Sequence, residues 1–363
     1  MGRGDTTSGR TTYGVLPSIQ VLRAVAAIGV AMSHVQLDLR TRVGLPEALP
    51  YLDVGTAGVD LFFVISGFIM VYASGPLFQS ADGSRVFFVR RLIRIVPLYW
   101  VCTTLYLAFP ILAPTIARTT YDLDLAIASF LFIPYPRPDG MYPVAGQGWT
   151  LNYEMFFYSI FALAVVLPRR LAVVAVTVAL TAIVCIGFLF ALPQPLAFWA
   201  NPIMLEFVLG CLLGLAYVEG ARFGLSARIA LVVGGLSLWG LLETLEPGSP
   251  SFMTRGIPAA LVLAGAVFGQ QRQVTTTGRV LCLVGDASYA LYLFHPLFIR
   301  ALREIALRTG VATPMAQWLY LMITLVAVTA AALAIHYAFE RPITRVLRRL
   351  GRKRMLASAP MAS

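Results

Sequence analysis

Residues 16–37 read LPSIQVLRAVAAIGVAMSHVQL, an apolar run long enough to cross a lipid bilayer as one helix. The run contains two ionisable residues, Arg23 and His34, separated by eleven positions. Because eleven residues make about three helical turns, the two side chains share one helix face, about 16 Å apart along the axis. Ionisable groups are costly inside a bilayer, and they usually face a protein interior and mark a functional site. Arg23 and His34 are therefore the first candidates for such a site.

The composition is typical of a membrane protein with several spans. Of the 363 residues, 58% are hydrophobic and only 12% are charged, which excludes an ordinary soluble domain. The net charge of +11 does not indicate nucleic-acid binding, because the arginines cluster in short segments between apolar runs. The four cysteines are scattered, with neither a disulfide nor a metal-ligand spacing. The first apolar run is too long for a signal peptide and is expected to remain as a helix.

Ten apolar runs are long enough, or nearly so, to cross a bilayer. Their expected ranges are 16–37, 55–73, 92–113, 149–167, 171–191, 197–218, 228–245, 255–270, 280–299 and 314–339. A shorter apolar piece over 125–134 is expected to be re-entrant or interfacial, and the proline-rich stretch 134–143 is expected to form a loop. The sequence thus predicts an all-α, polytopic membrane helical bundle of about ten transmembrane helices.

The distribution of positive charge predicts the orientation of this bundle. With both termini in the cytoplasm, 19 of the 28 Lys and Arg residues fall on the inner side and 8 on the outer side, and Arg23 lies within a span. Cytoplasmic loops are usually the more basic ones, so this bias supports cytoplasmic termini. One outer segment opposes the rule, since it carries Arg300, Arg303 and Arg308. We expect one transmembrane domain over 1–354 and a disordered cytoplasmic tail over 355–363.

Titratable residues from four different runs fall at one depth, near the outer side. They are His34, Asp60, Glu154 and His295. A histidine oriented by a carboxylate can act as a general base toward a hydroxyl group, and Asp38, one turn beyond His34, is a second possible partner. A lone histidine in an apolar helix is more often structural, but the accompanying carboxylates favour a functional role for His34. For His295 both interpretations stay open, and His336 is expected to be structural.

A second charged cluster falls at the inner side. Arg91 and Arg94 are three residues apart and share one helix face where the third run begins. The planar guanidinium group binds phosphate oxygens in pairs, so these two residues, with Arg23, suit a phosphate-bearing ligand. The alternative is ordinary positive-inside charge, which we favour for Arg90. Glu206 is expected to neutralise one of these arginines.

Seven segments of the chain resemble, in order, motifs of the acyltransferase family 3 membrane proteins. They are residues 22–34, 58–68, 91–100, 149–158, 206–210, 288–296 and 340–342. The Arg…His motif of the family falls on Arg23 and His34, and its Arg-x-x-Arg motif falls on Arg91 and Arg94. The variant over 152–158 is most similar to the branch that acetylates bacterial exopolysaccharides.

This resemblance implies a multi-pass O-acyltransferase of the bacterial inner membrane. It implies no permanently bound cofactor and no metal. It implies acyl-CoA, most often acetyl-CoA, as a co-substrate that arrives from the cytoplasm. The expected acceptor is an extracytoplasmic glycan, either exopolysaccharide or a lipid-linked oligosaccharide. Alternatives are acylation of a macrolide or lipid-linked small acceptor, and a non-enzymatic carrier of glycans or anions, although a carrier would predict internal repeats.

Residue roles follow from the motifs and the predicted depths. His34 is expected to be the general base, with Asp60 and Glu154 as catalytic carboxylates. Arg23, Arg91 and Arg94 are expected to hold the phosphates of the donor. The residues expected to bind the acceptor in the cavity of His34 are Asp38, Trp149, Tyr153, Tyr289 and His295. The aromatic members could stack on a sugar ring or belong to an interfacial belt.

Overall fold

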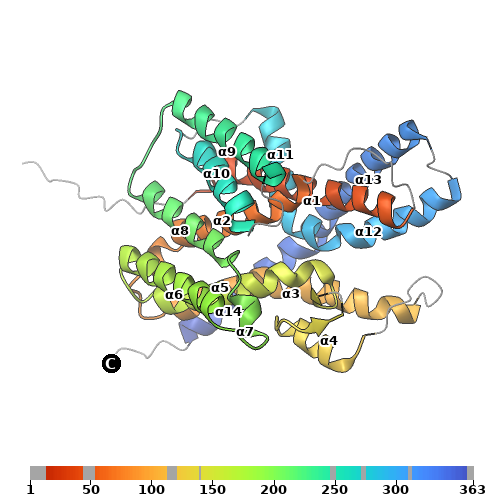
Figure 1. The fold of residues 1–363 in the computed structure, drawn as a ribbon. Helices are drawn as coiled ribbons and strands as arrows, with labels where there is room; N and C mark the ends of the chain where they lie inside the picture. Colours follow the sequence, from red (N-terminus) through yellow and green to blue (C-terminus); the bar gives the residue numbers. More distant parts are fainter. Residues whose placement is uncertain are drawn as a thin grey trace, which may run out of the picture.

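The computed structural model describes residues 14–43, 54–112, 121–138, 140–245, 251–270, 275–309 and 313–357. Within these ranges the chain is almost entirely helical, which confirms the all-α class (Figure 1). The α-helices are α1 (Pro17–Thr41), α2 (Val54–Ala73), α3 (Gly83–Leu112), α4 (Leu123–Phe130), α5 (Trp149–Ala164), α6 (Arg169–Leu189), α7 (Leu196–Trp199), α8 (Met204–Val218), α9 (Leu225–Leu245), α10 (Ile257–Val267), α11 (Thr276–Asp286), α12 (Ser288–Thr309), α13 (Pro314–Ile335) and α14 (Arg341–Ala357). Short 3₁₀ turns are η1 (Gly75–Leu77) and η2 (Gly146–Gly148), and π turns are η3 (Phe252–Gly256) and η4 (His336–Glu340).

Six helices of the described ranges are long and apolar enough to cross a membrane. They are Pro17–Thr41, Gly83–Ile111, Arg169–Leu189, Leu196–Val218, Leu225–Leu245 and Met315–Gly351. α11 and α12 together would make a further span, bent by 69°, and Ala57–Ala73 and Phe252–Val267 are shorter apolar helices. The described part of every expected range is mostly helical, although 197–218 and 280–299 are each divided between two helices, so the chain is a multi-pass membrane protein. Ten crossings and the side of the termini remain predictions.

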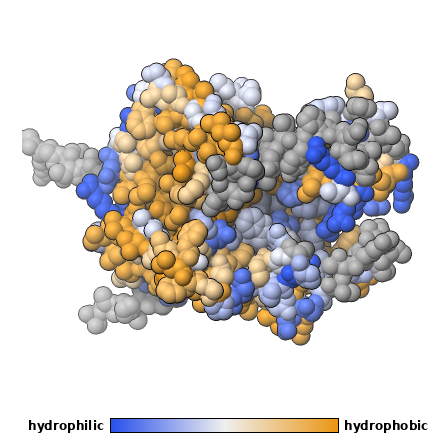
Figure 2. Space-filling view, in the orientation of Figure 1, coloured by the Kyte–Doolittle hydropathy of each residue, from blue (hydrophilic) through white to orange (hydrophobic). Residues whose placement is uncertain are grey.

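The surface of the bundle agrees with a position in lipid. Figure 2 shows hydrophobic side chains gathered over α6, α8 and α9. Large apolar residues such as Val174 and Phe188 on α6, and Val233 and Leu236 on α9, are exposed. Soluble monomers rarely expose an apolar patch of this extent, whereas lipid tails accommodate it.

Helix ends follow local sequence signals. Pro17 occupies the first turn of α1, where its missing N–H is not needed. Thr275 and Thr313 cap α11 and α13 by accepting backbone N–H bonds of 3.2 Å each. Asp122 caps α4, which forms part of the segment expected to be re-entrant or interfacial. The apolar periodicity alone does not define the first residue of each helix, and these caps do.

Two expected non-helical segments differ from the structure in detail. The loop expected over 134–143 contains a small antiparallel hairpin, β1 (Pro136–Arg137) and β2 (Gly140–Met141), in which Pro136 pairs with Met141. Strands of two residues are too short to show an alternating pattern in the sequence. The tail expected from residue 355 begins inside α14, which continues to Ala357, and the residues after 357 lie outside the described ranges.

Helix α1 lies in the middle of the bundle. It packs against α2, α11 and α12, and in Figure 1 α9 and α10 lie on one side of it and α3, α5 and α6 on the other. α2 in turn packs against α8 at two glycines. A Cβ atom on Gly67 would overlap the carbonyl oxygen of Phe207, and one on Gly210 would overlap that of Val64. Small residues allow this close approach of membrane helices, and it fixes Asp60 on α2 beside Glu206 on α8.

Candidate active site

Three cavities bring together the ionisable residues of the bundle. The arginine cavity, of about 360 Å³, is lined by residues that include Arg23, Ser66, Arg91, Arg94, Glu154, Tyr158, Tyr289 and Arg348. The histidine cavity, of about 270 Å³, is lined by residues that include His34, Asp60, Gln147, Trp149 and Arg255. The vestibule, of about 630 Å³, is lined by residues that include His34, Asp38, Arg42, Tyr106, Tyr121, Arg300, Arg303 and Glu304.

The three expected donor-binding arginines of the arginine cavity come from two separate helices. Arg23 comes from α1, and Arg91 and Arg94 come from one turn of α3. Arg23 donates a 3.2 Å hydrogen bond to the side chain of Gln20, and the guanidinium of Arg91 lies 5.5 Å from the ring centre of Phe87. The structure thus places the three expected donor-binding arginines around one space.

The carboxylates near this cavity are fewer than its arginines. Glu154 lies against Ser66 and Tyr158 on its wall. Arg94 is 3.9 Å from Glu340, a buried residue of η4 that also accepts a 2.8 Å hydrogen bond from His336 Nδ1. His336 therefore has the structural setting that the sequence predicted. The excess of positive charge suits an anionic ligand.

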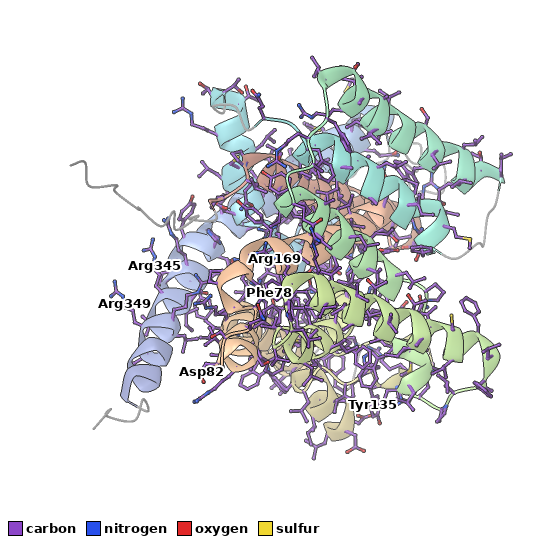
Figure 3. All side chains as sticks on the ribbon, turned by 90° about the vertical axis from the view of Figure 1, so that its left-hand side faces the viewer. Phe78, Asp82, Tyr135, Arg169, Arg345 and Arg349 are labelled. Carbon is purple, nitrogen blue, oxygen red and sulfur yellow. The ribbon has the colours of Figure 1, made fainter. Side chains whose placement is uncertain are left out.

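Sequence reasoning missed a fourth arginine of this cavity. Arg348 on α14 lines the arginine cavity, whereas Arg345 and Arg349 point away from the bundle (Figure 3). The basic segment after the last apolar run was interpreted only as positive-inside charge. Helical spacing gave no clear signal, because Arg348 is three residues from Arg345, a spacing that places two side chains near one helix face.

His34 lines both the histidine cavity and the vestibule. Its Nδ1 lies 2.9 Å from the backbone oxygen of Val30. A carbonyl oxygen can only accept, so Nδ1 carries the proton, and in the neutral ring Nε2 keeps its lone pair. Within the described ranges no carboxylate lies within ion-pair distance of His34. The expected carboxylate partner is therefore replaced by a backbone carbonyl, which fixes the same tautomer.

The ring of His295 packs against the ring of His34. The two ring centres are 4.8 Å apart, the rings are edge to face, and His295 Nδ1 lies 3.1 Å from the oxygen of Leu291. His295 is only 1% exposed and lines none of the three cavities. The expectation that it lines the acceptor cavity is wrong, because its ring is buried against the ring of His34.

Asp60 shares the histidine cavity with His34, and it is held by other charges. Its carboxylate lies 3.3 Å from Arg255 Nε, and Arg255 also lies 3.5 Å from Glu243. Glu206, which accepts a 3.5 Å hydrogen bond from Ser251, neighbours Asp60. The expectation that Glu206 neutralises Arg91 or Arg94 is therefore wrong, since the close packing of α2 and α8 places it at Asp60. Arg255 projects from the π turn η3, a feature frequent at functional sites.

The aromatic and acidic residues of α5 and α12 that were expected in one cavity lie on different helix faces and line different spaces. Trp149 lines the histidine cavity as expected, whereas Glu154 and Tyr289 line the arginine cavity. Tyr289 donates a 2.8 Å hydrogen bond to the oxygen of Ile95. Tyr153 lines none of the three cavities and stacks on Phe198, with ring centres 4.1 Å apart. The expectation of one shared cavity is therefore wrong for Glu154, Tyr153 and Tyr289, because equal depth does not fix the direction of a side chain.

Asp38 lines the vestibule together with His34, but it does not pair with the histidine. Its carboxylate accepts a 2.7 Å hydrogen bond from Arg303 on α12. The ion pair joins the ends of two helices that also hold the histidine rings together. Asp38 is thus placed to form the wall of the vestibule.

The arginine and histidine cavities adjoin. Val59 on α2 and Tyr292 on α12 line both of them. The hydroxyl of Tyr292 lies 2.9 Å from the side chain of Thr150 and donates to the oxygen of Gln147 at 2.9 Å. An anion held by the arginines could therefore extend a group past Val59 and Tyr292 toward His34.

Comparisons with known proteins agree with the motifs. A family model described as an acyltransferase domain matches residues 16–337. The chain is 32% identical over 307 residues to the exopolysaccharide production protein ExoZ of Rhizobium meliloti (strain 1021), covering 81% of this chain and 91% of ExoZ. It is 28% identical over 382 residues to the acyltransferase MdmB of Streptomyces mycarofaciens, covering 95% of each.

A more distant relative is longer than this chain. The O-acetyltransferase OatA of Staphylococcus aureus (strain NCTC 8325 / PS 47) is 25% identical over 372 residues, which cover 91% of this chain but 57% of OatA. No solved structure matches the chain. The relatives are thus acyltransferases and an exopolysaccharide production protein.

Proposed function

This chain belongs to the acyltransferase family 3 and is a membrane O-acyltransferase, and we propose that it acylates a glycan outside the bacterial inner membrane with a group taken from cytoplasmic acyl-CoA. Acyl-CoA, most simply acetyl-CoA, is a co-substrate, and no cofactor stays bound. The single observation that carries this proposal is the junction of the arginine cavity with the histidine cavity at Val59 and Tyr292.

The arginine cavity is the proposed donor site. Coenzyme A carries several phosphate charges, and arginine binds phosphate through paired hydrogen bonds. Arg23, Arg91 and Arg94 line one cavity, and Arg348 adds a further guanidinium to its lining. The thioester end of the donor then points toward Val59 and Tyr292.

His34 is the proposed general base. Its Nε2 removes the proton of the acceptor hydroxyl as that oxygen attacks the thioester carbonyl carbon. The new C–O ester bond forms, the C–S bond breaks, and the leaving thiolate takes the proton back from the imidazolium. The hydrogen bond from Nδ1 to Val30 keeps Nε2 available throughout this cycle. Asp60, held by Arg255 in the same cavity, stabilises the transient imidazolium by its negative charge.

The acceptor is proposed to be an exopolysaccharide unit or its lipid-linked precursor. Similarity to ExoZ over most of both chains supports this choice. Trp149 on the wall of the histidine cavity offers a face on which a sugar ring can stack. Acylation of a macrolide or lipid-linked small acceptor uses the same chemistry, and similarity to the acyltransferase MdmB favours it as the second candidate. The carrier alternative is set aside, because the matching family model is an acyltransferase domain and MdmB and OatA are acyltransferases.

A transfer assay with two acceptor classes tests this proposal. The purified protein in lipid nanodiscs is given radiolabelled acetyl-CoA and either an extracted exopolysaccharide oligosaccharide or a macrolide. We expect ester-linked label on the oligosaccharide, and loss of ester groups from the surface glycan of a strain lacking the gene. Label on the macrolide alone, with unchanged glycan esters in the deletion strain, would support the second candidate. No label on either acceptor would contradict both.

A further inference from the structure

The vestibule contains three arginines, two of which, Arg42 and Arg300, the fold and the proposed reaction leave unexplained. Arg42, Arg300 and Arg303 line it beside His34, at the end of the bundle expected to face away from the cytoplasm. Positive charge is normally depleted on that side of a membrane protein. Arg300 and Arg303 are three residues apart on α12, so they share one helix face.

Among the residues that the structure describes, the ion pairs of the vestibule involve Arg303 and neither of the other two arginines. Arg303 lies 2.7 Å from Asp38 and 3.6 Å from Glu304, so two carboxylates neutralise it. Among the described residues, neither Arg42 nor Arg300 has a carboxylate within ion-pair distance. Both are exposed to the cavity, and the guanidinium of Arg300 stacks 5.5 Å from the ring centre of Tyr106.

Arg300 lines the same cavity as the proposed base, His34. Arg300 follows His295 by five residues on α12, which corresponds to about 7.5 Å along a helix axis. His295 is in ring contact with His34, and His34 itself lines the vestibule. An anion bound at Arg300 would therefore lie close to the hydroxyl that His34 deprotonates.

We propose that the vestibule binds an anionic group of the acceptor through Arg42 and Arg300, so that the preferred acceptor is an acidic glycan. This inference rests on the proposed function and adds the acceptor's charge to it. Tyr121 supplies an aromatic face for a sugar ring beside the two arginines, whereas the Tyr106 ring is buried beneath Arg300. The anion is a carboxylate on the glycan, or the diphosphate of a lipid carrier, since guanidinium groups bind both.

Matched acceptors test the charge preference within one protein sample. The full chain in nanodiscs receives acetyl-CoA and either a glucuronate-containing oligosaccharide or its carboxyl-reduced counterpart. A third acceptor is the reduced oligosaccharide linked to undecaprenyl diphosphate. The variants are Arg300→Gln and Arg42→Gln. Arg308→Gln is the control, since Arg308 is also exposed on α12 but does not line the vestibule.

We expect the unaltered protein to show a kcat/KM at least tenfold higher for an acidic acceptor than for the neutral one. Arg300→Gln should reduce that ratio about tenfold, because a charge-assisted hydrogen bond is lost, and Arg308→Gln should leave it unchanged. A preference for the glucuronate form assigns the carboxylate, and a preference seen only with the lipid-linked form assigns the diphosphate.

Equal kcat/KM values for all three acceptors, in the unaltered protein and in both variants, would overturn the acidic-acceptor inference and leave the proposed function intact. Absence of transfer to every glycan would instead contradict the proposed function. The ratio is taken within each variant, so a loss of folded protein cancels.

Discussion

The arginine cavity and the histidine cavity share Val59 and Tyr292 but differ in their balance of positive and negative side chains. In the arginine cavity, guanidinium groups outnumber the carboxylates on its walls. In the histidine cavity, Arg255 is held between Asp60 and Glu243, and the His34 ring is bound through Nδ1 to a backbone oxygen and not to a charged group. The difference indicates a division of labour, in which one cavity supplies binding energy for an anion and the other supplies proton transfer.

Removal of the proposed base, His34, is the strongest test of these separate roles. We expect His34→Gln to lower acyl transfer at least 100-fold, since loss of a general base typically costs about 10²-fold or more. Acyl-CoA affinity should stay within about twofold, because His34 does not line the arginine cavity. Initial rates and a binding isotherm on the same nanodisc sample measure both. More than about a tenth of the activity remaining would show that His34 is not the base.

The arginine cavity is tested by keeping its charge and changing its geometry. We expect Arg91→Lys or Arg94→Lys to weaken acyl-CoA binding about tenfold, because lysine lacks the paired donors of guanidinium. Arg85→Lys is the matched control, since Arg85 is exposed on α3 and lines none of the three cavities. Equal dissociation constants for all three variants would leave these arginines with a role in topology alone.

Substitution of Glu154 is expected to change acyl-CoA affinity the least, and it tests to which of the two cavities Glu154 contributes. Because it lines the arginine cavity, Glu154→Gln should tighten acyl-CoA binding a few-fold by removing a negative charge near the phosphates, with the KM for the acceptor unchanged. Steady-state kinetics with each substrate varied in turn measures the two effects. A change in the acceptor KM at constant donor affinity would instead assign Glu154 to the reaction at His34.

The sequence could predict which segments form helices and at what depth in the membrane most of the charged residues lie. Hydropathy marked the ranges that became helices, and helical spacing placed Arg91 and Arg94 on one face. The motif around Arg23 and His34 fell on α1, the helix around which the cavities are arranged. These features follow from the chain's local periodicity, which the bilayer constrains strongly.

The rotation of each helix about its own axis, which sets the direction of its side chains, could not be predicted. Glu154 and His34 were expected in one cavity because they share a depth, but they line different cavities in the structure. Glu206 was expected near the inner arginines, yet the close contact of α2 and α8 at Gly67 and Gly210 turns it toward Asp60. Such directions depend on packing between helices, which leaves no periodic signal in a single sequence.

An electron cryomicroscopy map of the protein in nanodiscs with a non-hydrolysable acyl-CoA tests the division between the cavities most directly. We expect the phosphates to lie among Arg23, Arg91 and Arg94, and the acyl carbonyl to reach past Val59 and Tyr292 toward His34 Nε2. Phosphate density in the histidine cavity or the vestibule would contradict the assignment, as would an acyl group directed away from His34.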